Sequence, residues 1–339
     1  MLNKLLAAAG AAFVVLASGG AEAGPTLDAV KARGHLECGV HLGLPGFSYA
    51  DDKGVWSGLD VDLCRALAAA IFGDANKVKY TPTSTQQRFA ILSSGQVDLL
   101  SRNTTITFSR DASLGIDFAG INFYEGQTFI VRKSSGVKSV KDLNGATACV
   151  AAGTTEEKNA GDYFRANGWE LKIVTFAKND DAVATYDAER CDAYTAGIGA
   201  LAGQRIKLKN PDDHVILTEV ISNDPQGPVV RHGDNQWEDI VRWTLNATIA
   251  AEALGVTSQN VDDMKKSPNA EIRRLLGVEG DFGPMLELPK EWAYNAIKQV
   301  GNYGESYERT VGKGSILKLD RGLNQLWTKG GILFTPSFN

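Results

Sequence analysis

The sequence predicts an α/β protein of two lobes that are joined by two hinge strands and separated by a cleft. Segments with strand and helix patterns alternate between residues 36 and 101, and the same alternation returns between residues 146 and 195. Two short extended apolar segments, 128–132 and 227–231, lie on either side of the second series. We interpret these two segments as the hinge strands that cross between the lobes.

The first series is predicted to form a mostly parallel sheet with helices on both faces. Its elements, strand first and then alternating, are expected at residues 36–40, 60–72, 77–81, 86–94 and 97–101. The apolar residues of the first helix recur at helical spacing, and the second helix ends at a glycine. Strands that alternate with helices in this way usually pair in parallel, so this series is expected to build one lobe.

The second series repeats this architecture and is predicted to build the second lobe. Its elements, again strand first, are expected at residues 146–151, 156–167, 171–176, 179–189 and 191–195. Because ligands of open α/β sheets bind beyond the carboxyl ends of the strands, two such lobes that face each other would form a cleft lined by strand-end loops.

The chain after the second hinge segment is predicted to be helical and to return to the first lobe. The expected helices lie at residues 237–254, 261–266, 270–276 and 291–300. The first lobe would then be discontinuous, with residues 24–131 and 230–339, and the second lobe would hold residues 132–229.

Residues 1–23 have the pattern of a secretory signal peptide. Lys4 precedes an apolar run from Leu5 to about Ser18, and small residues stand at positions 21 and 23, as signal peptidase requires. This run is too short to span a hydrocarbon layer of about 30 Å with margin, and no later segment reaches about 20 uncharged apolar residues. We therefore expect export to the periplasm as a soluble protein.

Charge and motifs exclude several functional classes. The net charge of −5 is mild and gives no reason to expect nucleic acid or an anionic membrane as partner. No cofactor is predicted. No metal is predicted either, because the four histidines show no paired spacing and no two cysteines stand at CxxC spacing.

Four cysteines in an exported chain favour disulfides over free thiols. Three pairings are possible. We prefer Cys38–Cys64 with Cys149–Cys191, because each pair closes a local loop inside one predicted lobe and leaves the lobes free to move.

Several ordered motifs resemble the polar-amino-acid-binding proteins of ABC transporters, and within them the general L-amino-acid binders of solute-binding protein family 3. The motifs are CGV at 38–40, GLPGFS at 43–48, GLDVD at 58–62, LSRNTT at 100–105, SRD at 109–111, GTT at 153–155, CDAYT at 191–195 and WTKGG at 327–331. The resemblance covers nearly all of the mature chain. It implies a type II periplasmic-binding-protein fold that closes on its ligand.

The resemblance also implies a carboxylate clamp after the 97–101 strand. Arg110 offers a planar, two-pronged donor that matches a carboxylate, and Thr105 supports it with its hydroxyl and backbone N–H. The backbone carbonyl of Asn103 is expected to accept from a ligand ammonium. From the second lobe, Thr154 and Thr155 open the helix near residue 156, where free backbone N–H groups attract anions. Either threonine can instead serve as the N-cap of that helix.

Three further residues are candidates for reading the rest of the ligand. Arg88 stands on the 86–94 helix at the position where glutamate-binding relatives contact the ligand side chain, and His41 follows the first strand. Thr195 ends the 191–195 strand. If Arg88 and His41 face the cleft, polar or acidic side chains are preferred, and His41 makes binding pH-sensitive near its ordinary pKa of about 6.5. Placement on the surface is the alternative for both.

The sequence departs from the resemblance at Gly197, where relatives carry an aspartate that pairs with the ligand ammonium. An enclosed ammonium without a counter-charge is costly. Either another acid replaces the aspartate, with Glu156 and Asp192 as candidates, or the ligand is a carboxylate that lacks a free α-ammonium.

The sequence therefore predicts a periplasmic binding protein of an ABC importer, and not an enzyme. The expected partners are a small amino acid or related carboxylate and a transporter permease, and the protein is expected to act as a monomer. The alternative is an enzyme on the same fold, similar to cyclohexadienyl dehydratases, which needs a positioned acid. The chain lacks GxSxG and HExxH, and Gly197 removes the most obvious acid.

Overall fold

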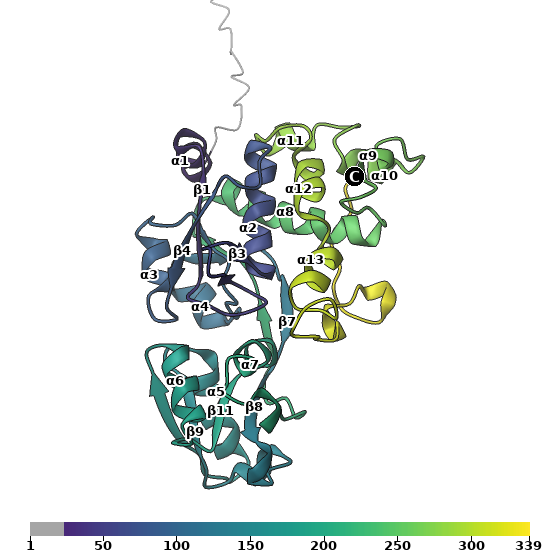
Figure 1. The fold of residues 1–339 in the computed structure, drawn as a ribbon. Coiled ribbons are helices and arrows are strands. Elements are labelled where there is room, and N and C mark those ends of the chain that lie inside the picture. Colours follow the sequence, from purple (N-terminus) through teal and green to yellow (C-terminus); the bar gives the residue numbers. More distant parts are fainter. Residues whose placement is uncertain (1–23) are drawn as a thin grey trace, which may run out of the picture.

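The computed structural model describes residues 24–339 and divides them into two α/β lobes, one above the other in Figure 1. Each lobe is built around a five-stranded sheet. The predicted signal peptide lies outside the described residues. Within residues 24–339 every helix falls short of the length and apolar character that membrane crossing needs.

The sheet of the first lobe combines parallel and antiparallel strands. In spatial order it contains β4 (Val78–Thr83), β1 (Leu36–His41), β5 (Leu99–Leu100), β14 (Val229–Arg231) and β6 (Ile116–Phe118). Strand β1 runs parallel to both β4 and β5, whereas β14 runs antiparallel to β5 and β6. Because β14 comes from late in the chain, the first lobe is assembled from two separate stretches of sequence.

Helices cover this sheet and enclose the main core of the protein. They are α1 (Pro25–Arg33), α2 (Leu59–Phe72), α3 (Arg88–Ser93), α4 (Phe108–Ser113), α8 (Asn235–Ala253), α9 (Val261–Met264), α10 (Ala270–Leu275), α11 (Phe282–Met285), α12 (Trp292–Val300) and α13 (Tyr303–Thr310). A small hairpin of β2 (Tyr49–Ala50) and β3 (Trp56–Ser57) precedes α2.

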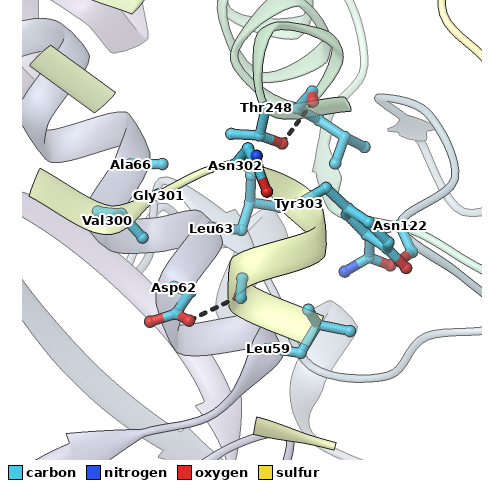
Figure 2. Close-up of a pocket in the computed structure, with 12 residues that line it drawn as sticks. Leu59, Asp62, Leu63, Ala66, Asn122, Thr248, Val300, Gly301, Asn302 and Tyr303 are labelled. Carbon is cyan, nitrogen blue, oxygen red and sulfur yellow. Dashed lines mark hydrogen bonds between the residues drawn. The ribbon is translucent and has the colours of Figure 1, made fainter. Parts of the chain in front are cut away.

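The C-terminal helices pack on α2 of the first lobe. Helix α2 contacts α8, α12 and α13. Buried Asp62 on α2 accepts hydrogen bonds at 2.6 Å from the Ser306 hydroxyl and from Arg309, both on α13. Figure 2 shows Asp62 beside α13, at the edge of a small cavity between these helices. A charged network thus ties α13 to α2 of the first lobe.

The sheet of the second lobe has the same number of strands. In spatial order it contains β10 (Lys172–Phe176), β9 (Thr147–Ala151), β11 (Ala193–Gly197), β8 (Gln127–Arg132) and β12 (His214–Ile216). Strand β9 is parallel to β10 and β11, and β8 is antiparallel to β11 and β12. Its helices are α5 (Thr155–Ala166), α6 (Asn179–Asp187) and α7 (Ile198–Arg205).

The strands that cross between the lobes are β7 (Phe123–Glu125) and β13 (Asp224–Gln226), which pair antiparallel between the two sheets (Figure 1). The prediction that segments 128–132 and 227–231 are the hinge strands was therefore wrong. The first is β8, inside the second sheet, and the second leads into β14, inside the first sheet. Their apolar character reflects burial in a sheet, whereas the crossing strands carry polar residues.

Two disulfides form, with the predicted pairing. Cys38 on β1 is bonded to Cys64 on α2, with Cα atoms 6.4 Å apart, and Cys149 on β9 is bonded to Cys191 just before β11, with Cα atoms 5.8 Å apart. Each bridge thus lies within one lobe and ties an element to its own sheet.

Candidate ligand-binding site

A polar cavity lies where the two lobes face each other. It encloses about 410 Å³ of unfilled space, part of which is open to solvent. All eight residues that the sequence analysis selected line this cavity: His41, Arg88, Asn103, Thr105, Arg110, Thr154, Thr155 and Thr195. The lining also includes polar residues that sequence reasoning had not assigned to the site, among them Thr85, Arg102, Asn179 and Tyr194.

The first lobe presents its site residues at the ends of neighbouring strands. His41 is the last residue of β1, Arg102 follows β5, and Arg88 begins α3, the helix after β4. Because β4, β1 and β5 are parallel neighbours, their carboxyl ends meet at one edge of the sheet. The fold thereby gathers two buried guanidinium groups and an imidazole at this edge.

Arg110 enters the cavity from α4. Its Nη1 donates to the backbone oxygen of Thr105 at 2.7 Å, and its guanidinium carbon lies 5.6 Å from the centre of the Phe89 ring. The side chain is buried, and burial lowers the pKa of Arg110 from its usual value. One donor of the fork is thus held by the chain itself, and the others remain available to a carboxylate.

The second lobe faces Arg110 with the start of α5. Thr154 is the N-cap: its hydroxyl accepts from the N–H of Glu157 at 3.2 Å and donates to the oxygen of Ala151 at 2.7 Å. The Thr155 hydroxyl reaches across the cleft to within 3.4 Å of the Thr105 hydroxyl. The first N–H groups of a helix have no acceptor within the helix, so this end of α5 suits an anion.

Thr195 holds the site together from within the second lobe. Its hydroxyl donates to the Thr128 oxygen and accepts from the Gln127 side chain, both at 2.8 Å. The same Gln127 amide donates to the Glu156 backbone oxygen at 2.9 Å. Thr195 therefore ties β11 to β8 and also lines the cavity, and Gln127 connects this pair of strands to the first turn of α5.

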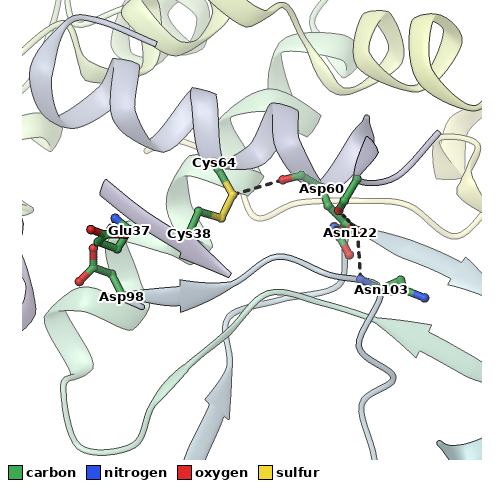
Figure 3. Close-up of a disulfide and its surroundings, with 8 residues drawn as sticks. Glu37, Cys38, Asp60, Cys64, Asp98, Asn103 and Asn122 are labelled. Carbon is green, nitrogen blue, oxygen red and sulfur yellow. Dashed lines mark hydrogen bonds between the residues drawn. A yellow bond between two sulfur atoms is a disulfide. The ribbon is translucent and has the colours of Figure 1, made fainter. Parts of the chain in front are cut away.

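Asn103 adopts a backbone conformation that turns the chain sharply after β5. Its φ of 36° lies in the left-handed region, which asparagine tolerates better than most residues. The Asn103 N–H donates to the carboxylate of Asp60 at 3.1 Å, and Figure 3 shows Asp60 with Asn103 and Asn122 beside the Cys38–Cys64 bridge. Burial raises the pKa of Asp60 to about 6.

His41 is buried in a basic environment. Burial, followed by the positive charges of Arg102, Lys207 and Arg88, lowers its pKa well below the ordinary value of 6.5. The expected titration near pH 6.5 is therefore displaced to lower pH, and the imidazole is neutral at physiological pH. Its Nδ1 accepts from the Gly43 N–H at 3.0 Å, so Nε2 carries the proton and can donate.

Three acids are relevant to the missing aspartate at Gly197. Asp192 is exposed and accepts from the Thr147 N–H at 2.8 Å, so it does not reach the cavity. Glu156 lines the cavity. Glu125, which sequence reasoning missed, occupies the space that a side chain at 197 would need. In the sequence, Glu125 could have been recognised as an acidic residue just before the apolar segment that forms β8.

Glu125 is held at the hinge. Its carboxyl accepts from the Gly199 N–H at 2.7 Å and from the side chain of Gln226 on β13. Burial raises the pKa of Glu125 to about 8, and the nearby negative charges of Glu156, Asp224 and Asp60 add to that effect. Glu125 lines a separate cavity with Gly199 and Tyr307.

Two α/β lobes that enclose a polar cavity and are joined by a pair of crossing strands define a two-lobed solute receptor. The chain belongs to the bacterial extracellular solute-binding proteins, family 3, whose family profile matches residues 36–260. The predicted family and fold class are thereby confirmed.

Relatives of known name support this assignment over nearly the whole chain. The "General L-amino acid-binding periplasmic protein AapJ" of Rhizobium johnstonii is 52% identical over 338 residues, which cover 99% of each chain. The "Glutamate/glutamine/aspartate/asparagine-binding protein BztA" of Rhodobacter capsulatus is 49% identical and covers 96% of this chain and 97% of its own. Both are named as binding proteins and not as enzymes, as the sequence predicted.

A solved structure of similar sequence agrees with the fold. An "ABC transporter / periplasmic binding protein from Brucella ovis with glutathione bound" is 55% identical, has a TM-score of 0.91, and covers 93% of this chain and 99% of its own. The similarity therefore includes both lobes.

Proposed function

We propose that this chain is the periplasmic receptor of an ABC importer, and that it holds the α-carboxylate of an amino acid or small peptide between Arg110 and the start of α5. The observation that carries the proposal is the position of Arg110. It is buried in the cavity, only one of its donors is used by the described chain, and it faces a helix N-terminus on the other lobe.

The relatives support the ligand class. AapJ and BztA are named as amino-acid-binding proteins, and the structure from Brucella ovis is named with bound glutathione, a peptide with free carboxylates. The family role of these proteins supports a permease as the partner. We also propose that the protein is exported to the periplasm and acts there as a monomer.

Glu156 is our proposed partner for a ligand ammonium. It is the one carboxylate among residues 24–339 that lines the cavity. Its side chain lies 3.2 Å from the Thr155 hydroxyl, at the end of the cavity where we place the α-carboxylate. An amino acid held at Arg110 would bring its ammonium to the same end, because both groups are attached to one carbon.

Closure of the lobes about β7 and β13 is the proposed mechanism. The pairing of β8 with β11 supports a second lobe that begins before residue 131, so we propose lobes of residues 24–122 with 227–339 and of residues 126–223. The ligand would shift an open–closed equilibrium toward the closed form, and no bond would be made or broken.

Isothermal titration of the mature protein tests the proposal. The panel contains the L-amino acids, their 2-oxo analogues without an ammonium, and glutathione. Binding of at least one α-carboxylate compound is the expected result, and this binding should be weakened in Arg110→Ala but unchanged in the surface control Arg165→Ala. Binding of 2-oxo acids but not of amino acids would show that Glu156 does not hold an ammonium. No binding to any compound of the panel would overturn the proposal.

A further inference from the structure

The part of the chain that follows α13 returns to the hinge. It contains a short 3₁₀ turn, Gly322–Asn324, which contacts β7, and it is drawn in yellow beside that strand in Figure 1. This turn lies beyond residues 36–260, the part of the chain that the family profile matches. The family profile therefore does not include this contact with the hinge.

Asn324 binds the backbone of Tyr124 with both ends of its side-chain amide. The Tyr124 N–H donates to Asn324 Oδ1 at 2.6 Å, and Asn324 Nδ2 donates to the Tyr124 carbonyl oxygen at 2.8 Å. Only 4% of Asn324 is exposed, so water does not readily replace these bonds. Because β7 and β13 form a sheet of only two strands, the Asn324 side chain takes the place of a third strand beside β7.

Arg321 fixes Asn324 to the first lobe. Its Nε and Nη2 donate to the Asn324 carbonyl oxygen at 3.1 and 2.8 Å. Its Nη2 also pairs with Glu252 on α8 at 3.0 Å, and its guanidinium carbon lies 4.7 Å from the centre of the Tyr307 ring on α13. Arg321 and Asn324, which we call the hinge brace, are thus attached to two helices of the first lobe.

The other crossing strand, β13, is attached to the first lobe by its main chain. The Pro225 oxygen accepts from the Ile106 N–H at 2.8 Å, and the Gly227 N–H donates to the Thr104 oxygen at 3.1 Å. Pro225 lies opposite Tyr124 in the pair of crossing strands. Both strands are therefore held to the first lobe at the same level, β13 by backbone bonds and β7 by the hinge brace.

The second lobe has room to move relative to the hinge brace. A cavity of about 730 Å³, partly open to solvent, is lined by both residues of the brace and, from the second lobe, by Ile198 and Val220. Because the peptide groups on both sides of Tyr124 are held, rotation of the second lobe has to occur after it, at Glu125 and Gly126. Glycine has the widest choice of backbone angles, which suits a pivot.

We propose that Asn324, positioned by Arg321, attaches β7 to the first lobe and confines the rotation of the hinge to the residues after Tyr124. The proposal rests on the proposed function, because it takes closure about β7 and β13 as the motion. Without the hinge brace, β7 would bend over its whole length, and the ligand-free protein would sample more open forms. The closed form would then be less populated, and ligand affinity would fall although every residue of the ligand cavity is unchanged.

Asn324→Ala tests the hinge brace, with Gln299→Ala as the matched control. Gln299 on α12 also binds main chain with both ends of its amide, at the Ala75 N–H (2.8 Å) and the Gly73 oxygen (2.9 Å), but inside the first lobe. The radius of gyration of ligand-free Asn324→Ala, measured by small-angle X-ray scattering, should exceed that of wild type. Its affinity for whichever of L-glutamate, L-glutamine and glutathione binds wild type should fall by roughly three- to tenfold in isothermal titration. Gln299→Ala should match wild type in both measurements.

Two further measurements do not depend on the folding of Asn324→Ala. Arg321→Gln keeps the Asn324 side chain but weakens its attachment, so it should change the radius and the affinity in the same direction by a smaller amount. In wild type, hydrogen exchange of the Tyr124 N–H, followed by NMR, should be slow both with and without ligand, because the brace holds this group in open and closed forms.

The outcomes separate this inference from the proposed function. Fast exchange of the Tyr124 N–H in ligand-free wild type would show that the brace releases when the lobes open, and would overturn the inference. A radius and an affinity of Asn324→Ala equal to those of Gln299→Ala would also overturn it, and the receptor function would stand in both cases. No binding of any panel compound by wild type would overturn the proposed function, whereas the ligand-free radius and the Tyr124 exchange rate would still decide the role of the brace.

Discussion

The Thr155 hydroxyl at the start of α5 lies 3.4 Å from the Thr105 hydroxyl of the first lobe, across the cleft. Two further contacts join the lobes nearby: Thr85 with Asn179 at 3.2 Å, and Lys207 with the Gly43 oxygen at 3.3 Å. The lobes therefore meet at several points around the cavity. A ligand in this form would be enclosed by both lobes, so binding and closure are coupled.

Arg110→Ala is expected to weaken binding of an α-carboxylate ligand by about 1–3 kcal/mol, because a charged hydrogen-bond donor to the ligand is lost. Arg110→Lys should recover only part of the affinity, since an ammonium cannot present the two-pronged donor. Titration calorimetry measures both. An affinity within twofold of wild type in Arg110→Ala would show that the carboxylate is held elsewhere.

Gly203→Ala is expected to obstruct closure. Gly203 lies on α7, and a Cβ there would stand 2.7 Å from the Pro45 backbone oxygen and 3.0 Å from a Leu44 methyl group of the first lobe. Alanine favours a helix over glycine by about 1 kcal/mol, so the second lobe itself should not be destabilised.

Small-angle X-ray scattering measures this effect on closure. The radius of gyration of wild type should fall when ligand is added, and that of Gly203→Ala should fall less, with weaker binding. Gly43→Ala is the matched control, because a Cβ at Gly43 would meet no atom within 4 Å. The same compaction in Gly203→Ala as in wild type would contradict the coupling of α7 to closure.

Glu125 should make the protein less stable as the pH rises. Burial raises its pKa from 4.5 to about 8, so the folded state keeps a proton that the unfolded state releases. Between these two values the unfolded state binds fewer protons, and the free energy of unfolding falls with increasing pH. Glu125→Gln removes this dependence while it keeps an acceptor for the Gly199 N–H.

Melting temperatures at several values between pH 4.5 and 9, without ligand, check this prediction. The advantage of Glu125→Gln over wild type should grow toward pH 8 and then level off. Parallel curves for the two proteins over the whole range would show that the Glu125 carboxyl titrates normally.

Each disulfide is expected to stabilise its own lobe. The bridges close loops with sequence separations of 26 and 42 residues, and loops of this size correspond to roughly 3–4 kcal/mol of stabilisation. Replacement of either cysteine pair by serine should lower the melting temperature and leave the ligand affinity measured at low temperature nearly unchanged, because both bridges lie inside lobes. A large loss of affinity in a well-folded variant would contradict this assignment.

Local sequence patterns predicted the main elements and the residues of the cavity well. The strand-to-loop motif at residues 100–105 and the GTT motif before α5 both lie at carboxyl ends of strands, and parallel sheets bring such ends to one edge. His41, Arg88 and Arg110 reach the same cavity for that reason.

Other features depend on tertiary contacts that no local sequence pattern predicts. The apolar segments 128–132 and 227–231 resembled hinges, but their apolar character came from burial in the two sheets. Arg102 follows a short central strand and would ordinarily be solvated; only the three-dimensional arrangement buries it beside Arg88. Glu125 reaches Gly197 because β8 begins two residues after Glu125 and pairs with β11, with Gln127 opposite Gly197. This contact joins residues that are 72 positions apart in the sequence.

The most direct test of the central claim is a crystal structure of the mature protein with the tightest-binding α-carboxylate compound of the panel. The account predicts that the ligand lies between the lobes, with its α-carboxylate between the Arg110 guanidinium and the first turn of α5. A ligand bound outside this cavity, or bound within it with its α-carboxylate away from Arg110, would contradict the account.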